Sequence, residues 1–160
     1  MGIADAYLQL AYATMNLGKY DEALKINNDA LMIYDHLVIS EKSSDKSSIL
    51  KQKARTYINT GIVFWYQGKY PEALKQQFTA LKIANEISDK PGMAISYNNI
   101  GLVYGSQGNS PEALKNQLAA LKIFEKIGDK RRIANSYINI GTIYRNQYNF
   151  PERSSYISLW

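Results

Sequence analysis

The sequence predicts an all-α solenoid of antiparallel helix pairs. Three observations support this fold class: the chain repeats itself at a fixed period, the repeated apolar positions have helical spacing, and a glycine-containing turn separates the two helical segments of each unit. A single helix pair cannot bury its apolar face alone, so repeated pairs of this length stack and cover one another.

Twelve residues of one unit recur forty positions later in the chain. Tyr57 and Gly61 return as Tyr97 and Gly101, and the segment 71–75 returns forty residues on. We therefore expect one domain over residues 1–160, made of repeat 1 (4–53), repeat 2 (54–93), repeat 3 (94–133), a partial repeat 4 (134–152) and an atypical tail (153–160).

The first helix of each unit is predicted from a stripe of apolar residues. In repeat 3 this helix covers about 94–106, and Tyr97, Ile100 and Tyr104 follow one another at spacings of three and four. Gly101 lies in the same stripe, although a glycine inside a helix costs about 0.5–1 kcal/mol against alanine. The recurrence of this glycine predicts that a neighbouring helix passes too close for a larger side chain.

The second helix follows a turn at residues 107–110. Ser110 is a suitable N-cap, Pro111 suits the first helical position, and the helix dipole favours the carboxylate of Glu112 in the first turn. The helix is expected to end near Gly128. Its buried side is expected to contain Ala113, Leu114, Leu118, Leu121 and Ile127.

A tyrosine four residues before a packing glycine, with an alanine in the middle of the second helix, resembles the tetratricopeptide repeat over nearly the whole chain. The usual period of that family is about thirty-four residues, and the additional residues here fall at the end of the second helix. The longer form is similar to repeats of cell-polarity adaptors and of bacterial sensor proteins that join such arrays to a kinase, cyclase or DNA-binding output. The resemblance implies a right-handed superhelix, with first helices lining a concave groove and second helices on the convex back.

Two segments depart from the repeat. Repeat 1 carries ten additional residues near 40–48, a polar, serine-rich stretch that we interpret as a solvated loop or a frayed helix extension, with a flap over one end of the groove as the alternative. The tail has Arg153, Ser154 and Ser155 where the repeat predicts Ala-Leu-Lys, so a native, a frameshifted and an artificial origin stay open for residues 153–160. A repeat array needs a polar cap, and this tail is strongly apolar. The tail either folds back as an improvised cap or pairs with another molecule, and we favour self-association as a homodimer through the C-terminal end.

Composition excludes several classes of protein. The 46% hydrophobic and 21% charged residues fit one compact domain, and no apolar run of about 18 residues predicts a membrane span. The chain has no cysteine, which excludes disulfides and thiolate metal sites. A cytoplasmic location is favoured, and a periplasmic one applies if the array belongs to a membrane-bound sensor.

No motif of catalytic chemistry is complete. His36 is the only histidine, and it has neither a cysteine nor a matching carboxylate pair to act with. Gly61 to Lys69 resembles a phosphate loop only superficially, because tyrosine follows the lysine where serine or threonine is required. We therefore expect no enzyme activity, no metal and no cofactor.

The stripe opposite the packing glycine is predicted to face the groove, and one of its positions recurs as an amide in Gln9, Asn59, Asn99 and Asn139. A carboxamide has both a donor and an acceptor, so a row of them suits the backbone of an extended peptide. The alternative is that these amides bridge adjacent helices inside the scaffold. The complete set of expected peptide-binding residues is Gln9, Tyr12, Arg55, Asn59, Ile62, Trp65, Tyr66, Asn98, Asn99, Leu102, Asn139 and Arg145.

The expected groove carries few charges. The formal net charge is +5, from 19 basic and 14 acidic residues, yet the four first-helix segments contain only Asp5, Arg55 and Arg145. A nucleic-acid surface requires a basic stripe, so we expect no nucleic-acid partner. The sequence thus predicts a non-enzymatic scaffold that binds a peptide or protein segment. The alternative is a sensory, regulatory or dimerising segment of a larger bacterial signalling protein, such as a kinase, cyclase or transcription regulator.

Overall fold

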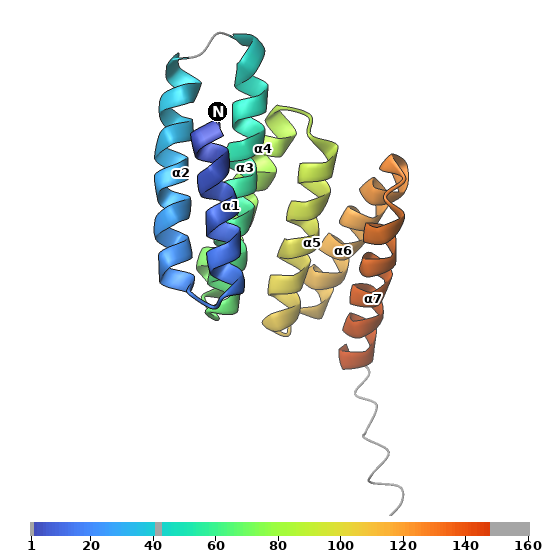
Figure 1. Cartoon of the computed structure of the whole chain (residues 1–160). Coiled ribbons are helices and arrows are strands. Elements are labelled where there is room, and N and C mark those ends of the chain that lie inside the picture. Colours follow the sequence, from blue (N-terminus) through green and yellow to red (C-terminus); the bar gives the residue numbers. More distant parts are fainter. Residues whose placement is uncertain (1, 41–42, 148–160) are drawn as a thin grey trace, which may run out of the picture.

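The computed structural model describes residues 2–40 and 43–147, and within them it contains seven helices and no strand. The helices are α1 (Gly2–Asn16), α2 (Tyr20–Ser40), α3 (Ser43–Tyr66), α4 (Tyr70–Glu86), α5 (Lys90–Ser106), α6 (Ser110–Ile127) and α7 (Lys130–Gln147). Figure 1 shows them following one another across the molecule, from α1 and α2 at one end to α7 at the other. The predicted all-α solenoid is confirmed.

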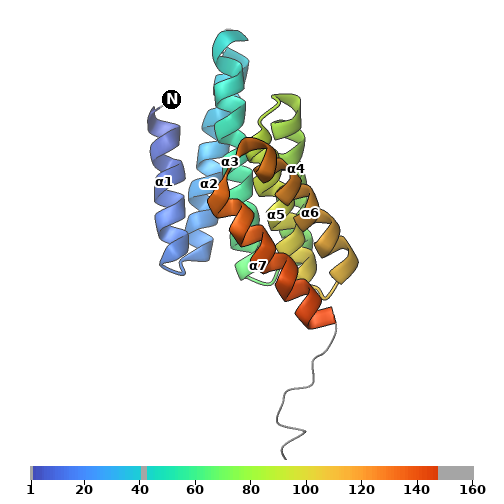
Figure 2. The ribbon, with the colours of Figure 1, turned by 90° about the vertical axis from the view of Figure 1, so that its right-hand side faces the viewer.

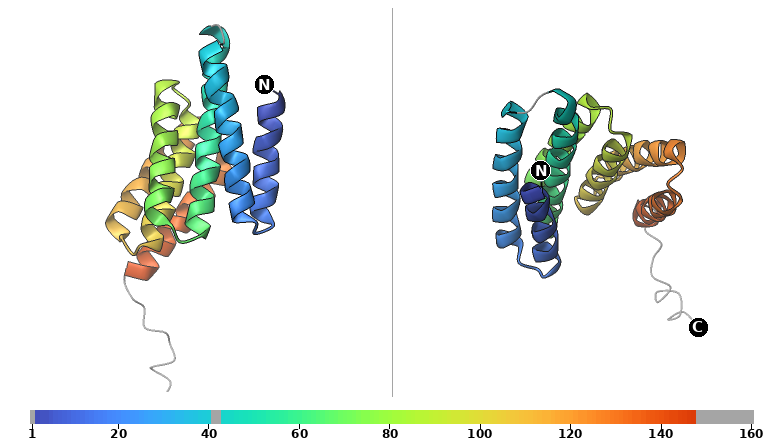
Figure 3. Two further views of the ribbon diagram at one scale, coloured as in Figure 1. Left: turned by 90° about the vertical axis from the view of Figure 1, so that its left-hand side faces the viewer. Right: turned by 45° about the horizontal axis from the view of Figure 1, so that its top comes forward.

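The helices form two layers. Each helix packs against the next one in the chain, and α1, α3, α5 and α7 also contact one another in succession, whereas the described parts of α2, α4 and α6 do not. The odd-numbered helices are therefore the inner layer of a curved stack, and the even-numbered helices are its outer layer. Figures 2 and 3 show the curvature from two further sides, with the axis of α7 strongly tilted relative to that of α1.

Small residues at the helix crossings let the two layers approach closely. Ala23, Ala73 and Ala113 lie near the beginning of the three outer helices, and each is fully buried. Ala80 and Ala120, which follow Ala73 and Ala113 by about two turns of the same helix, are also fully buried. A larger side chain at any of these positions would separate the layers, because protein interiors are close-packed.

The packing glycines face amide side chains of the outer layer. A Cβ atom on Gly61 would lie 2.5 Å from Gln77 Nε2, and a Cβ atom on Gly101 would lie 2.9 Å from Gln117 Nε2. The predicted close approach is confirmed at these two positions. A Cβ atom on Gly141 would have no described atom within 4 Å.

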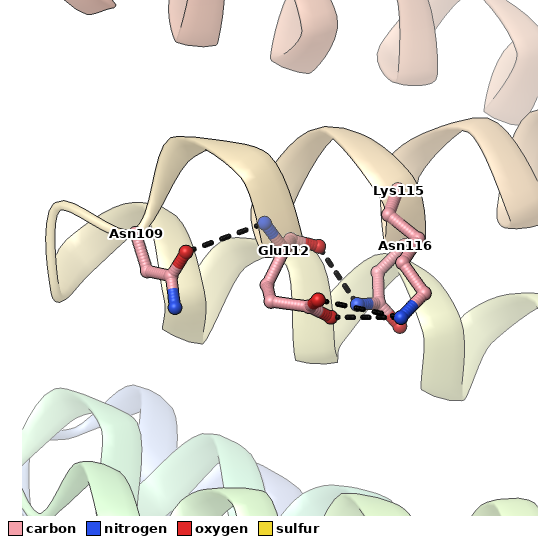
Figure 4. Close-up of polar contacts among 4 residues, drawn as sticks. All are labelled: Asn109, Glu112, Lys115 and Asn116. Atoms are coloured by element: carbon pink, nitrogen blue, oxygen red, sulfur yellow. Dashed lines mark hydrogen bonds and ion pairs between the residues drawn. The ribbon is translucent and has the colours of Figure 1, made fainter.

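Asn109 is the N-cap of α6, and the prediction that Ser110 caps this helix is wrong. The helix begins one residue earlier than expected, and Asn109 Oδ1 accepts a hydrogen bond from the backbone N–H of Glu112 at 3.3 Å (Figure 4). The Glu112 carboxylate accepts from Lys115 Nζ at 3.2 Å, and its carbonyl accepts from Asn116 Nδ2 at 2.7 Å. The first turn of α6 is thus held by side-chain hydrogen bonds.

The buried side of α6 differs in part from the predicted one. Ala113 and Leu121 are buried as expected, but Leu118 is 48% exposed and Ile127 is 37% exposed. Gln117 is fully buried instead. An apolar pattern missed this arrangement because the position that faces Gly101 holds an amide.

The additional residues of repeat 1 lengthen two helices. α2 continues to Ser40 and α3 begins at Ser43, so the described residues here are helical and the predicted solvated loop is wrong for them. Residues 41–42 lie outside the described part. Ile49, which is 1% exposed, packs against Ala30 and Tyr34 and gives this end of the array a small core of its own.

Candidate functional site

Cavities follow the inner layer of the array, where the sequence predicts a groove. The one between α1 and α3, called here the α1–α3 hollow, has a volume of about 300 Å³. It is lined by Leu8, Gln9, Tyr12, Arg55, Ile58, Asn59, Ile62 and Ile95. Tyr12 is 51% exposed, whereas Leu8 and Ile58 form a mostly buried floor.

A second cavity, the aromatic pocket, lies between α3 and α5 and has a volume of about 170 Å³. Its lining consists of Gly61, Ile62, Trp65, Tyr66, Gln77, Asn99, Leu102 and Val103. Trp65 Nε1 donates a hydrogen bond to Ser106 Oγ at 2.8 Å, which ties the indole to α5. The Tyr66 ring stacks on Tyr20 at a centroid distance of 5.9 Å. The aromatic wall is therefore held from both sides.

A third cavity, the α5–α7 hollow, continues the row and has a volume of about 280 Å³. It shares Trp65 and Leu102 with the aromatic pocket and adds Asn139 and Thr142 from α7. The three cavities are thus adjacent along the inner layer.

Buried amides connect the layers behind the aromatic pocket. Gln77 Nε2 donates to the backbone carbonyl of Ile58 at 3.0 Å, and Gln77 Oε1 accepts from Asn99 Nδ2 at 3.5 Å. Asn99 Oδ1 accepts from Asn98 Nδ2 at 3.3 Å. Both ends of the Asn99 amide therefore have partners inside the scaffold.

The same arrangement recurs one repeat later. Gln117 Nε2 donates to the carbonyl of Asn98 at 3.0 Å, and Gln117 Oε1 accepts from Asn139 Nδ2 at 3.5 Å. Asn139 Nδ2 also donates to Asn98 Oδ1 at 3.1 Å. Asn139 thus bridges neighbouring repeats, as the scaffold interpretation of the repeated amides requires.

Repeat 1 lacks this network. Asn27 stands where the later repeats have glutamine, and it is 1% exposed. Neither Asn27 Nδ2 nor Asn27 Oδ1 has a hydrogen-bond partner among the described residues. Asn59, the counterpart of Asn99 and Asn139, makes no side-chain hydrogen bond within the described part of the chain and is half-buried at the α1–α3 hollow.

Arg55 is the charged residue in the lining of the α1–α3 hollow. Its Nη1 donates to Gln52 Oε1 at 3.2 Å, and the side chain is exposed. Asp5 lies at the same end of the array and accepts a hydrogen bond from the buried Tyr34 hydroxyl at 3.1 Å. Burial raises the pKa of Tyr34 well above its ordinary value, and the hydrogen bond to Asp5 and the charge of that carboxylate raise it further.

A further cavity of about 150 Å³ at the other end combines Asn98 with Arg131 and Arg132. The backbone N–H of Arg132 donates to Asp129 Oδ1 at 3.0 Å, and its guanidinium pairs with the same carboxylate. These two hydrogen bonds hold the pKa of Asp129 below its ordinary value. Arg132 is therefore occupied within its own turn.

The structure brings eleven of the twelve predicted binding residues to these cavities. The α1–α3 hollow collects Gln9, Tyr12, Arg55, Asn59 and Ile62; the aromatic pocket collects Ile62, Trp65, Tyr66, Asn99 and Leu102; the α5–α7 hollow collects Trp65, Leu102 and Asn139; and Asn98 lines the arginine-containing cavity. Arg145 is exposed and lines none of them.

Sequence reasoning missed Gln77 and Gln117, which hold the inner-layer asparagines. The available signal was their recurrence at the same forty-residue spacing as Gly61 and Gly101.

The described residues contain no cluster of side chains that is typical of a metal site. Over residues 2–40 and 43–147, no group of three or more histidine, cysteine, aspartate or glutamate side chains is placed to hold a metal ion. His36 is exposed on α2. None of the described helices combines the length and the hydropathy that a bilayer crossing requires.

Several solved structures share the fold. The apo form of RapI is similar with a TM-score of 0.78 at 20% identity, covering 92% of this chain and 50% of that one. BtubC from P. vanneervenii follows with a TM-score of 0.73 at 21% identity, covering 95% of this chain and 59% of that one. A signal transduction ATPase with numerous domains and a tetratricopeptide repeat sensor, from Pyrococcus horikoshii, has a TM-score of 0.58 at 19% identity, covering 90% of this chain and 26% of that one. This chain therefore spans only about a quarter to three fifths of these proteins.

No curated protein sequence matches the chain. Two family profiles do match, both described as tetratricopeptide repeat: one over residues 52–126 and 92–152, and the other over residues 4–35. Repeats of this family typically serve as protein-interaction scaffolds, and neither profile belongs to a catalytic family. Since the matches cover most of the sequence, the chain belongs to the tetratricopeptide repeat family.

Proposed function

We propose that this chain is a non-enzymatic scaffold that binds an extended peptide or partner segment along its inner layer. The observation that carries the proposal is the row of three adjacent cavities, which combine apolar walls with a small number of polar groups. Ligand sites in proteins commonly have this composition. Repeat arrays also use their concave surfaces for binding.

The aromatic pocket is the proposed anchor for an apolar side chain of the partner. Its volume of about 170 Å³ is close to that of a cavity of about 150 Å³ that accepts benzene in another protein. Trp65 is held by Ser106 and Tyr66 is stacked on Tyr20, so the walls need little reordering on binding.

Selection from a random peptide library displayed on phage tests the proposal. Leu102→Glu places a charge between two of the cavities and is expected to abolish the enrichment of peptides seen with the unchanged chain. Leu118→Glu is the matched control, because Leu118 is 48% exposed on the outer helix α6. Equal enrichment on all three proteins, or none on the unchanged chain, contradicts binding at the inner layer.

We also propose, as a second candidate, that the array is the sensory part of a longer signalling protein. The support is its structural likeness to a signal transduction ATPase that carries a tetratricopeptide repeat sensor. The complete reading frame that encodes this chain tests this candidate. A kinase, ATPase, cyclase or DNA-binding domain in the same frame is the expected result, and a frame with repeats alone contradicts it.

Homodimer formation through the C-terminal end is a further part of the proposal. Residues 153–160, on which the sequence argument rests, lie outside the described residues. The described support is the exposure of Tyr137 (56%) and Ile138 (65%) on α7. Light scattering of the chain, of the chain without residues 153–160 and of Ile138→Lys is expected to give a dimer only for the first. If all three proteins are monomeric at high concentration, the proposal is contradicted.

A further inference from the structure

A packing glycine and an outer-layer glutamine share one space in repeats 2 and 3. Cβ atoms built on Gly61 and Gly101 would lie 2.5 Å and 2.9 Å from the side-chain nitrogens of Gln77 and Gln117. The glutamine therefore occupies the volume that a methyl group would need. From this position it bonds both a carbonyl of its own repeat and the asparagine of the next one.

Repeat 1 changes both members of this pair. Ala11 replaces the glycine and Asn27 replaces the glutamine, and each is 1% exposed. The alanine methyl group takes the space, and asparagine is one methylene shorter than glutamine. Asn27 consequently has no partner for either amide atom among the described residues, which is a costly state for a buried polar group.

The substitution releases Asn59. In the later repeats the equivalent asparagines donate to the glutamine oxygen, and Asn99 accepts from Asn98 as well. Asn59 makes no side-chain hydrogen bond within the described part of the chain, although it lines the α1–α3 hollow and is half-buried. Its amide therefore offers one donor pair and one acceptor to a ligand, the combination that matches a peptide unit.

The charge at the hollow limits the kind of peptide that fits. Arg55 lies in the lining and is exposed, and within the described residues its side chain makes one hydrogen bond, to Gln52. Asp5 on α1 accepts a hydrogen bond from the Tyr34 hydroxyl. A guanidinium with free donors favours a carboxylate, which it can bind through two parallel hydrogen bonds.

We infer that the α1–α3 hollow is the end of the groove that grips the partner backbone, because the Ala11–Asn27 pair leaves Asn59 free. The partner is an extended segment in which a peptide unit pairs with Asn59 and an acidic side chain, flanked by apolar residues, pairs with Arg55. Asn99 and Asn139 hold the scaffold together instead. This inference rests on the proposed function and assigns different roles to residues that the repeat makes equivalent.

The experiment measures the affinity of one labelled peptide, chosen as the most enriched sequence from the phage-displayed random library. Fluorescence anisotropy compares the unchanged chain with Asn59→Ala, Asn99→Ala and Arg55→Gln. We expect about a tenfold loss of affinity for Asn59→Ala and for Arg55→Gln. A smaller loss is expected for Asn99→Ala, because Asn99 lines the aromatic pocket but its amide bonds Gln77 and Asn98. The enriched sequences are expected to contain aspartate or glutamate.

A double variant tests the role of the Ala11–Asn27 pair directly. Ala11→Gly with Asn27→Gln restores the pairing seen in repeats 2 and 3, so Asn59 is expected to bond the new glutamine and the affinity to fall as in Asn59→Ala. Ala11→Gly alone is the control, with affinity unchanged. Side-chain amide resonances of Asn59 in NMR spectra are expected to shift in the double variant only.

The outcomes separate the two proposals. Enrichment of peptides that is lost with Leu102→Glu but unaffected by Asn59→Ala overturns this inference and leaves the proposed function standing. An affinity that falls equally for Asn59→Ala and Asn99→Ala also overturns it, because the repeats would then act alike. No enrichment on the unchanged chain overturns both.

Discussion

The side chain of Gln117 packs directly against Gly101. A methyl group on that glycine would lie only 2.9 Å from Gln117 Nε2. The backbone carbonyl of Ala113 would lie 3.1 Å from the same methyl group. A backbone atom cannot withdraw as a flexible side chain can, so this crossing is closed to larger residues. Gly101 therefore lets the two helices pack closely and also leaves room for the side chain of Gln117, which bonds Asn98 and Asn139.

Gly101→Val is expected to destabilise the array by at least about 1–3 kcal/mol through overpacking. Helix propensity alone contributes less than about 1 kcal/mol and favours the valine. Gly141→Ala is the matched control, because no described atom lies within 4 Å of a Cβ there. It is expected to raise the free energy of unfolding by about 0.5–1 kcal/mol. Urea unfolding checks both, and a valine variant as stable as the unchanged chain contradicts the assigned crossing.

Ser88→Gly is expected to stabilise the protein by about 1 kcal/mol. Ser88 has a φ of 57° between α4 and α5, a conformation that costs L-residues about 1–2 kcal/mol and glycine little. At the equivalent turn the next repeat has Gly128, with a φ of 75°. The reverse exchange, Gly128→Ser, should lower the melting temperature. A fall in stability for Ser88→Gly would show that the serine side chain contributes more than the strained backbone costs.

Ile49→Ala is expected to cost about 2–5 kcal/mol, because Ile49 is 1% exposed in the core formed by the lengthened helices of repeat 1. Ile39→Ala, on the same extension but 86% exposed, should change stability by less than about 0.5 kcal/mol. Thermal unfolding of the two variants distinguishes a packed extension from a frayed one. Similar small changes in both variants would indicate fraying.

Tyr34→Phe is expected to flatten the alkaline limb of the stability profile. Burial and the neighbouring Asp5 raise the pKa of Tyr34 above its ordinary value of about 10, so the folded state holds the proton more tightly than the unfolded state. This contribution is fully present below about pH 10 and is lost as the pH rises above it, by at most about 1.4 kcal/mol per unit. Urea unfolding from pH 8 to pH 11.5 should therefore show a smaller loss in the variant.

The variant is also expected to be about 1 kcal/mol less stable at pH 8, because it lacks the hydrogen bond to Asp5. Parallel pH profiles for the two proteins would exclude Tyr34 as the source of the alkaline loss.

The fold was predictable because its determinants repeat. A tyrosine, a glycine and a set of alanines return at a fixed spacing, and their small size where helices cross leaves stacking as the arrangement that buries every apolar stripe. Which helix face is inner also follows from these residues. The helix extensions in repeat 1 were harder to predict, because their polar, serine-rich sequence is equally typical of a loop and only the packing of Ile49 on Tyr34 favours helix.

The sequence determined that Asn59, Asn99 and Asn139 occupy equivalent positions on the inner layer. The tertiary structure decided that Asn99 and Asn139 bond a glutamine of the outer layer, whereas Asn59 has no such bond within the described residues. An amide can bond a ligand or a neighbouring helix with the same atoms, so its type and spacing leave that choice open. The choice depends on whether a glutamine oxygen lies within reach across the helix crossing. Repeat 1 differs from the later repeats because Asn27 is one methylene group shorter than glutamine and Ala11 carries a methyl group where the later repeats have glycine.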